Sequence, residues 1–323
     1  MYTEFYGLTA LPFQLTPDPR FFFESSVHRR AVAHLMFGIE QSEGFIVVTG
    51  EVGAGKTTIL GHLLATLDTS KVVAAKVVST NLQAEDTLRS VASAFRLEFQ
   101  GSDKATLLRR IEDFLVSNHA RGLRTLLLID EAQNLSAAAL EELRMLSNFQ
   151  VGAKVPLQSF LLGQPQFRRT LANPDLEQFR QRIIASYHLG PMGEAETAEY
   201  VRHRLKLVGW TSKPAFTDSA MAEIFRNTDG VPRRINVLCS RVLLHAFLDG
   251  LMTIDGEVVR VVAEDHLREN AQIMDSSDGV RVTAPMVRDT AVLDRLDHVE
   301  RTVERHGRAL QFFASLAESK DRF

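Results

Sequence analysis

The chain has 323 residues, of which 45% are hydrophobic and 24% are charged, and its formal net charge is −3. This composition is typical of a soluble globular protein long enough for two domains, and the net charge disfavours a general nucleic-acid binder while permitting a local basic patch. The longest apolar runs fall short of the roughly 18 residues that cross a membrane, the N-terminus lacks the pattern of a signal peptide, and the single cysteine, Cys239, excludes internal disulfides and fits a reducing, cytoplasmic compartment.

The first 190 residues alternate between apolar runs and helical patterns. Residues 1–44 hold a proline-rich extended stretch and then a helix over about 26–40. Beyond them we expect strands at 45–50, 72–79, 125–130, 157–163 and 183–189, separated by helices near 55–67, 84–97, 103–120 and 136–148. Such alternation predicts an α/β fold in which a parallel sheet is sandwiched by helices.

The turn after the first expected strand carries the strongest motif. It matches G-x-x-x-x-G-K-[ST], the phosphate-binding loop (P-loop) of nucleotide triphosphatases, and reads Gly50-Glu51-Val52-Gly53-Ala54-Gly55-Lys56-Thr57, with Thr58 next. Glycines let backbone N–H groups surround phosphate oxygens, and the N-terminus of the following helix favours anions. We expect Lys56 to contact the β- and γ-phosphates of ATP and Thr57 to hold Mg²⁺.

A pair of acidic residues ends the third expected strand. Four apolar residues, 126–129, precede Asp130 and Glu131. Asp130 is expected to orient Mg²⁺, and Glu131 to polarise the attacking water as a positioned carboxylate. A strand that merely ends in an acidic turn is the alternative, which the P-loop upstream disfavours. The two motifs together predict a site that hydrolyses ATP.

The remainder of the chain is predicted to be helical. Helices at 193–208, 217–228, 232–248 and 262–273 suggest a small lid domain, with a short strand or turn at 251–254. The expected domains are therefore a nucleotide-binding domain over 1–190 with an extension at 1–44, a lid at 191–273, a polar linker at 274–290, and a heptad helix at 291–323. In the last segment, apolar residues recur every seven positions at Leu296, Val303, Leu310 and Ala317. This heptad seam is typical of a coiled coil for self-association or docking, the alternative being a helix that folds back on its own body.

These features resemble the AAA+ ATPases, and within them the branch of general secretion pathway protein A. The resemblance covers about residues 1–270 and is carried by Phe5-Tyr6-Gly7-Leu8, Thr16-Pro17-Asp18-Pro19, Asp130-Glu131-Ala132-Gln133-Asn134-Leu135, Leu162-Gly163-Gln164-Pro165 and Gly230-Val231-Pro232-Arg233-Arg234-Ile235-Asn236. Within this branch the chain looks most like the ATPases of the exosortase/PEP-CTERM system, which are encoded with exopolysaccharide genes. Secretion ATPases of the branch commonly continue into a transmembrane helix and a peptidoglycan-binding domain. This sequence contains neither, so a direct cell-wall role is not expected.

The resemblance implies roles for further residues. Gln164 matches the sensor-1 position and would contact the γ-phosphate or the attacking water. Arg180 and Arg182 fall in the region of the arginine finger, which reaches the nucleotide of a neighbouring subunit. Arg233 matches sensor 2 and would bind phosphate oxygens. The adenine base is expected against residues 12–31, whose phenylalanines also fit a plain core.

Three functions compete on this basis. The leading one is a Mg-ATP-dependent switch or motor that assembles as a homo-oligomer and acts on protein partners of an envelope export or exopolysaccharide system. Such a protein would be cytoplasmic and would reach the inner membrane only through its partners, without inserting into it. The second is a DNA-acting ATPase of the transposition-helper or replication-initiator type. The third is a nucleotide-binding scaffold without turnover, which the presence of Glu131 disfavours.

Overall fold

The computed structural model describes residues 1–16, 18–41, 44–78, 83–152 and 154–277. Contacts divide the chain into two compact units. Unit 2 comprises Leu11–Val208 and Phe225–Val237, and unit 1 comprises Met1–Ala10, Gly209–Ile224 and the chain from Leu238 onward. The predicted heptad helix at 291–323 and the linker beyond residue 277 lie outside the described residues.

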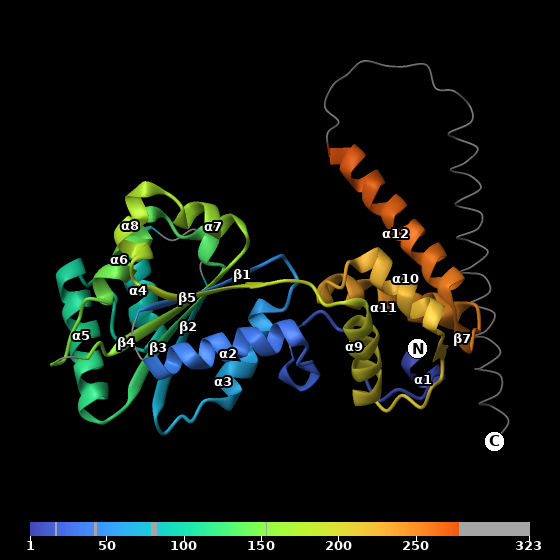
Figure 1. Ribbon diagram of the computed structural model, residues 1–323, viewed down its shortest axis with the longest axis horizontal. Helices are drawn as coiled ribbons and strands as arrows, with labels where there is room; N and C mark the ends of the chain where they lie inside the picture. The colour runs from blue at the N-terminus through green and yellow to red at the C-terminus, as the bar shows by residue number, and fades with distance from the viewer. Residues whose placement is uncertain (17, 42–43, 79–82, 153, 278–323) are drawn as a thin grey trace, which may run out of the picture. The chain divides into compact units, whose positions relative to one another are not determined.

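Unit 2 is built on a five-stranded parallel sheet (Figure 1). Its strands are β1 (Phe45–Gly50), β2 (Val72–Val78), β3 (Arg124–Asp130), β4 (Leu157–Gly163) and β5 (Ile183–Leu189). They lie in the order β2-β3-β4-β1-β5, so β4 is inserted between the strand that leads to the P-loop and the strand that ends in Asp130. The five expected strands are confirmed.

Helices cover both faces of this sheet (Figure 1). Alternate residues of one strand serve the two faces, as the twofold period of a strand requires: Ile46 and Val48 pack with α2 and α3, whereas Phe45 and Val47 pack on the opposite side. The helices are α2 (Ser26–Gln41), α3 (Lys56–Thr66), α4 (Ala84–Ala94), α5 (Lys104–Ala120), α6 (Ala137–Leu146), α7 (Gln166–Leu171), α8 (Glu177–Arg180) and α9 (Glu194–Leu207), with 3₁₀ turns η1 (Pro19–Phe21), η2 (Ala132–Asn134) and η3 (Pro174–Leu176).

Central strands of the sheet are buried from end to end. Every residue of β1 and β4 is buried, as is every residue of β3 after Arg124. Continuous apolar runs are expected where a parallel strand is covered on both faces. Because the sheet is parallel, the carboxyl ends of β1, β3 and β4 meet at one edge, and the motifs that follow these strands are brought together there.

Unit 1 combines the N-terminus with the later helices. It contains α1 (Tyr2–Phe5), the parallel pair β6 (Ala215–Phe216) and β7 (Thr253–Ile254), and α12 (Gly256–Ser277); helices α10 (Asp218–Thr228) and α11 (Pro232–Leu248) each contribute residues to both units. The Tyr6 hydroxyl donates to the carbonyl oxygen of Leu251 at 2.9 Å, and the Phe5 and Phe247 rings are 5.3 Å apart.

These contacts group Met1–Ala10 with the later helices, whereas the sequence assigns them to a domain over 1–190. Helix α12 also begins before residue 262 and continues past the expected boundary at 273. Cys239 is buried. Within the part of the chain that the structure describes, no helix combines the length and the apolar character needed to cross a membrane.

Gly230, which lies just before α11, offers a test of its close approach to Met192 within unit 2. Its φ is +69°, and an added Cβ would lie 2.0 Å from the carbonyl oxygen of Met192. Gly122 has a similar φ of +73° with open space around it. We expect Gly122→Ala to lower the free energy of unfolding by about 1–2 kcal/mol, and Gly230→Ala by roughly 2–5 kcal/mol because a backbone clash is added. Thermal melting measures both; equal melting temperatures would contradict the close approach.

Candidate functional site

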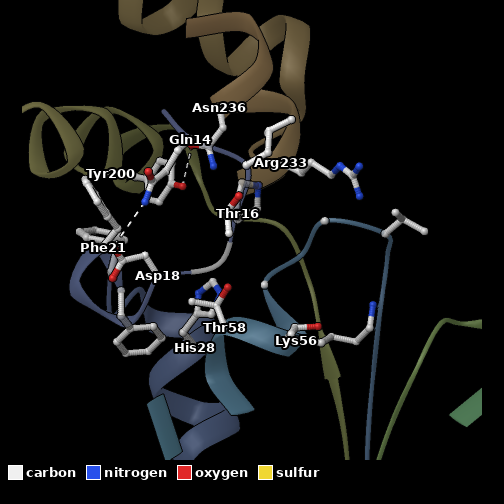
Figure 2. A pocket seen from close by; sticks show the side chains of 18 of the residues that line it. Gln14, Thr16, Asp18, Phe21, His28, Lys56, Thr58, Tyr200, Arg233 and Asn236 are labelled. Carbon is white, nitrogen blue, oxygen red and sulfur yellow. Dashed lines mark hydrogen bonds between the residues drawn. The ribbon is translucent and has the colours of Figure 1, made fainter. Parts of the chain in front are cut away.

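A cavity of about 310 Å³ lies in unit 2 beside the P-loop (Figure 2). In Figure 2, Lys56 and Thr58 belong to the P-loop and the start of α3, whereas Tyr200, Arg233 and Asn236 come from the helices on the opposite wall. The volume suits a nucleotide-sized ligand. Predicted site residues that line the cavity are Val52, Gly53, Gly55, Lys56, Thr57, Thr58, Glu131, Gln164 and Arg233.

The P-loop has the backbone shape that phosphate binding requires. Gly53 and Gly55 have φ values of +84° and +98°, a region that side chains with a Cβ avoid. Helix α3 begins at Lys56, so its N-terminal N–H groups face the cavity. The Lys56 ammonium donates to the carbonyl oxygens of Gly50 at 2.7 Å and Glu51 at 2.9 Å. Burial lowers the pKa of Lys56, and the nearby carboxylates Glu131 and Asp130 oppose that shift.

Asp130 and Thr57 form the candidate magnesium site. The Thr57 hydroxyl donates to Oδ2 of Asp130 at 3.0 Å, and the Asp130 side chain is only 5% exposed. Mg²⁺ prefers oxygen ligands and takes only one or two of them from the protein when phosphates supply others, so these two groups fit it. Within the described residues no cluster of three His, Cys, Asp or Glu side chains could hold a metal without a ligand's help.

Lys76 on β2 is a member of this site that the sequence analysis missed. Its ammonium lies 3.1 Å from Oδ2 of Asp130, the oxygen that also accepts from Thr57. A carboxylate this deeply buried needs a cationic or hydrogen-bonding partner, and here Lys76 supplies the positive charge. Parallel pairing of β2 with β3, which sets Val78 opposite Asp130, accounts for the proximity. The contact between Lys76 and Asp130 follows from the strand order, which the sequence analysis did not predict.

Glu131 stands immediately beyond β3 in an uncommon backbone conformation. Its φ is +57° and its ψ is +40°, the left-handed region that residues other than glycine seldom adopt. Its Oε2 accepts from the side-chain amides of Gln133 at 2.6 Å and Gln164 at 3.3 Å. Strand β4 ends between β1 and β3, which puts Gln164 next to both Glu131 and the P-loop.

The opposite wall joins residues 12–23 to helix α9. The Arg204 guanidinium is buried and donates to the carbonyl oxygens of Pro12 at 2.6 Å and Gln14 at 3.1 Å, and it lies 4.5 Å from the centre of the Phe21 ring. Tyr200 donates to the Asn236 side chain at 2.8 Å. This wall contains part of the 12–31 segment that was expected to receive adenine. Arg204, Tyr200 and Asn236 were not expected, because they are distant in sequence.

His28, on α2, contacts the P-loop at the carbonyl oxygen of Ala54. Its Nε2 is 3.2 Å from the carbonyl oxygen of Ala54, and its Nδ1 is 2.6 Å from the hydroxyl of Ser25. A carbonyl can only accept, so Nε2 carries the proton and Nδ1 accepts from Ser25. Burial lowers the pKa of His28, which keeps the ring neutral. An added Cβ on Gly55 would lie 2.7 Å from Nε2, so this glycine also permits the close packing of His28.

Arg233 is the second residue of helix α11 and lies next to the P-loop. Its backbone N–H donates to the carbonyl oxygen of Gly53 at 3.2 Å, and an added Cβ on Gly53 would lie 2.3 Å from Cβ of Arg233. The side chain lines the cavity (Figure 2). Gly53 therefore serves both the loop conformation and the approach of the helix.

The two candidate finger residues do not line the cavity. Arg180 donates to the carbonyl oxygens of Leu171 at 2.8 Å and Asn173 at 2.5 Å, whereas Arg182 donates to that of Ser147 at 3.1 Å. An arginine finger acts on the nucleotide of another subunit, so the finger role of Arg180 or Arg182 remains a prediction.

Replacing Lys76 tests the charge balance at Asp130. We expect Lys76→Met to destabilise the nucleotide-free protein by about 1–3 kcal/mol, because a buried carboxylate loses its cation. The control is Lys71→Met, which removes an exposed ion pair with Asp68 at 3.2 Å and should cost at most about 0.5 kcal/mol. Mg²⁺ with nucleotide should narrow the difference in melting temperature between Lys76→Met and Lys71→Met, because the metal supplies positive charge to Asp130. Equal melting of the two nucleotide-free variants would contradict this role.

Comparison with known proteins finds similarity to an AAA domain and to a secretion pathway protein. Residues 39–171 match the family model described as an AAA domain. The chain is 40% identical over 251 residues to general secretion pathway protein A of Aeromonas hydrophila, an alignment that covers 77% of this chain and 46% of that protein. The chain thus spans about half the length of this relative.

Two solved structures share the fold at low identity. Cdc6p from Pyrobaculum aerophilum aligns with a TM-score of 0.62 at 15% identity, covering 79% of this chain and 70% of that one. The ADP form of the Aeropyrum pernix ORC2 protein aligns with a TM-score of 0.60 at 15% identity, covering 78% and 71%. The P-loop, the parallel sheet and the similarity to these structures agree: this chain has the P-loop α/β fold, and its residues 39–171 match the AAA domain.

Proposed function

We propose that this protein is a Mg²⁺-dependent ATP hydrolase that works as a nucleotide-driven switch for an envelope export system. One observation carries the proposal: Lys56, Thr57, Glu131 and Gln164 line one cavity, and Asp130 is hydrogen-bonded to Thr57. These groups supply a phosphate-binding cation, two metal ligands, a carboxylate base and an amide donor. That set matches the needs of phosphoryl transfer to water.

The chemistry follows from the positions of these groups. With ATP bound, the Lys56 ammonium would exchange the carbonyl oxygens of Gly50 and Glu51 for phosphate oxygens. Thr57 and Asp130 would hold Mg²⁺, which supplies positive charge that stabilises the phosphate oxygens. Glu131 would accept a proton from the water that attacks the γ-phosphorus. The products are ADP and inorganic phosphate.

The biological role rests on the relative rather than on the site. The identity of 40% with general secretion pathway protein A supports a secretion-type ATPase. The finer assignment, to an exosortase or exopolysaccharide system, rests on the resemblance of the sequence motifs. Protein partners and a homo-oligomeric assembly belong to this proposal. We propose that the protein acts in the cytoplasm, with contact to the inner membrane made through those partners.

Two substitutions separate binding from hydrolysis. Glu131→Gln keeps the volume of the side chain but removes its basicity, so we expect turnover to fall by about 10²–10⁴-fold while ATP still binds. Lys56→Ala should abolish ATP binding, because the phosphates lose their cation. Phosphate release and titration calorimetry measure the two properties. A Glu131→Gln protein that turns over ATP at the wild-type rate would refute the catalytic assignment of Glu131, whereas a wild-type protein that binds ATP without turnover would favour the scaffold alternative.

Mixing two inactive variants tests the finger. If Arg182 acts across a subunit interface, then Arg182→Ala and Glu131→Gln subunits mixed in one oligomer should regain turnover, because some sites combine an intact Glu131 with a neighbour's Arg182. Arg180→Ala serves as the comparison, because Arg180 holds two carbonyl oxygens within its own subunit. Recovery with Arg180→Ala but not with Arg182→Ala would reverse the assignment, and absence of recovery in both mixtures would reject a finger at either position.

The DNA-acting alternative rests on the fold shared with Cdc6p and ORC2. Phosphate contacts make DNA binding weaken steeply with salt. A duplex-DNA mobility shift that disappears between low and physiological salt, together with DNA-stimulated turnover, would favour that alternative. We expect neither, because the chain carries a net charge of −3.

A further inference from the structure

A closed set of hydrogen bonds surrounds the carboxylate of Glu131. Gln133 Nε2 donates to Glu131 Oε2 at 2.6 Å, and Gln164 Nε2 donates to the same oxygen at 3.3 Å. The backbone N–H of Gln164 donates to Oε1 of Gln133 at 2.9 Å. Gln133 therefore ties the end of β4 to the residue that follows β3.

The orientation of the Gln133 amide is fixed by these partners. A backbone N–H can only donate, so the atom that Gln164 N–H contacts must be the amide oxygen of Gln133. The NH₂ group of Gln133 then faces Glu131, where it can only donate. The Gln133 amide thus accepts a hydrogen bond through its oxygen and donates one through its nitrogen. Rotating the amide by 180° would lose both bonds.

The backbone around Gln133 holds this arrangement in place. The 3₁₀ turn η2 begins after Glu131, and its residue Ala132 is fully buried in the sheet core, as is Leu135 at 4% exposure. The N–H of Asn134 donates to the carbonyl oxygen of Glu131 at 3.0 Å. The burial of Ala132 and Leu135 and the hydrogen bond from Asn134 therefore hold the strained φ of Glu131. Strain that a structure maintains in this way is characteristic of sites that position a reactive group.

We propose that Gln133 is a positioning residue for hydrolysis, a role that rests on the proposed function. Both amide donors converge on Oε2, and among the described residues no hydrogen bond to Oε1 of Glu131 is found. Gln133 fixes the carboxylate so that Oε1 is presented to the attacking water. The water O–H bond breaks with its proton passing to Glu131, the oxygen bonds to the γ-phosphorus, and the β–γ bridging bond breaks with its electron pair leaving on ADP.

Two substitutions of Gln133 test the proposal. Gln133→Met keeps the length of the side chain but removes both hydrogen bonds, and we expect kcat to fall about 10–100-fold with the KM for ATP and the ATP affinity unchanged. Gln133→Glu keeps an oxygen acceptor for the Gln164 N–H but turns a carboxylate toward Glu131. Its kcat should fall at least as far as that of Gln133→Met, because like charges push Glu131 out of position.

A control and a double mutant separate positioning from stability. Gln158→Met removes a buried amide bond to the Gly38 carbonyl oxygen near the start of β4, so it should lower the melting temperature and leave kcat unchanged. In the Glu131→Gln background, adding Gln133→Met should reduce single-turnover hydrolysis less than twofold, because a residue that acts through Glu131 has nothing left to position.

Wild-type kcat in Gln133→Met, or an equal loss with and without Glu131, would overturn the inference. If wild-type protein binds ATP without turning it over, the proposed function fails and the inference fails with it. If the wild-type protein hydrolyses ATP and the Gln133 variants have the same kcat, the inference about Gln133 is refuted while the proposed function stands.

Discussion

The site depends on the insertion of β4 between β1 and β3. Each strand pair is about 4.8 Å apart, so the ends of β1 and β3 are separated by roughly 10 Å. Strand β4 ends within that gap, and Gln164 follows it and lines the cavity together with the P-loop and Glu131. Phe160, Leu161 and Leu162 are fully buried, with Leu161 in the core on one face of the sheet and Phe160 and Leu162 in the core on the other, so helices pack β4 from both sides.

Three charged side chains of the site have internal partners. Lys56 donates to P-loop carbonyl oxygens, Asp130 is paired with Lys76 and Thr57, and Glu131 accepts from two glutamine amides. Buried charges without partners are costly, so these contacts keep the ligand-free protein stable. When a nucleotide binds, these side chains would exchange their internal partners for the ligand. The free energy lost with each internal contact then offsets part of the free energy of binding.

The second wall of the cavity ties distant segments into the same unit. Arg204 from α9 binds carbonyl oxygens of Pro12 and Gln14, and Arg233 at the start of α11 donates its N–H to Gly53. A ligand that contacts this wall therefore touches the N-terminal segment, α9, α11 and the P-loop together.

The sequence by itself determined the five strands, the covering of the sheet on both faces, the P-loop and the Asp130-Glu131 pair. These are local patterns: burial repeats with a fixed period, and phosphate chemistry demands glycines and a lysine at fixed spacing. Tertiary structure alone decided the strand order, the pairing of Lys76 with Asp130, the grouping of Met1–Ala10 with later helices, and the contacts of Gln133 and Arg204. Periodicity reports that a residue is buried but not which residue it meets, and the Gln133–Gln164 and Arg204–Pro12 bonds join positions 31 and 192 apart in the chain.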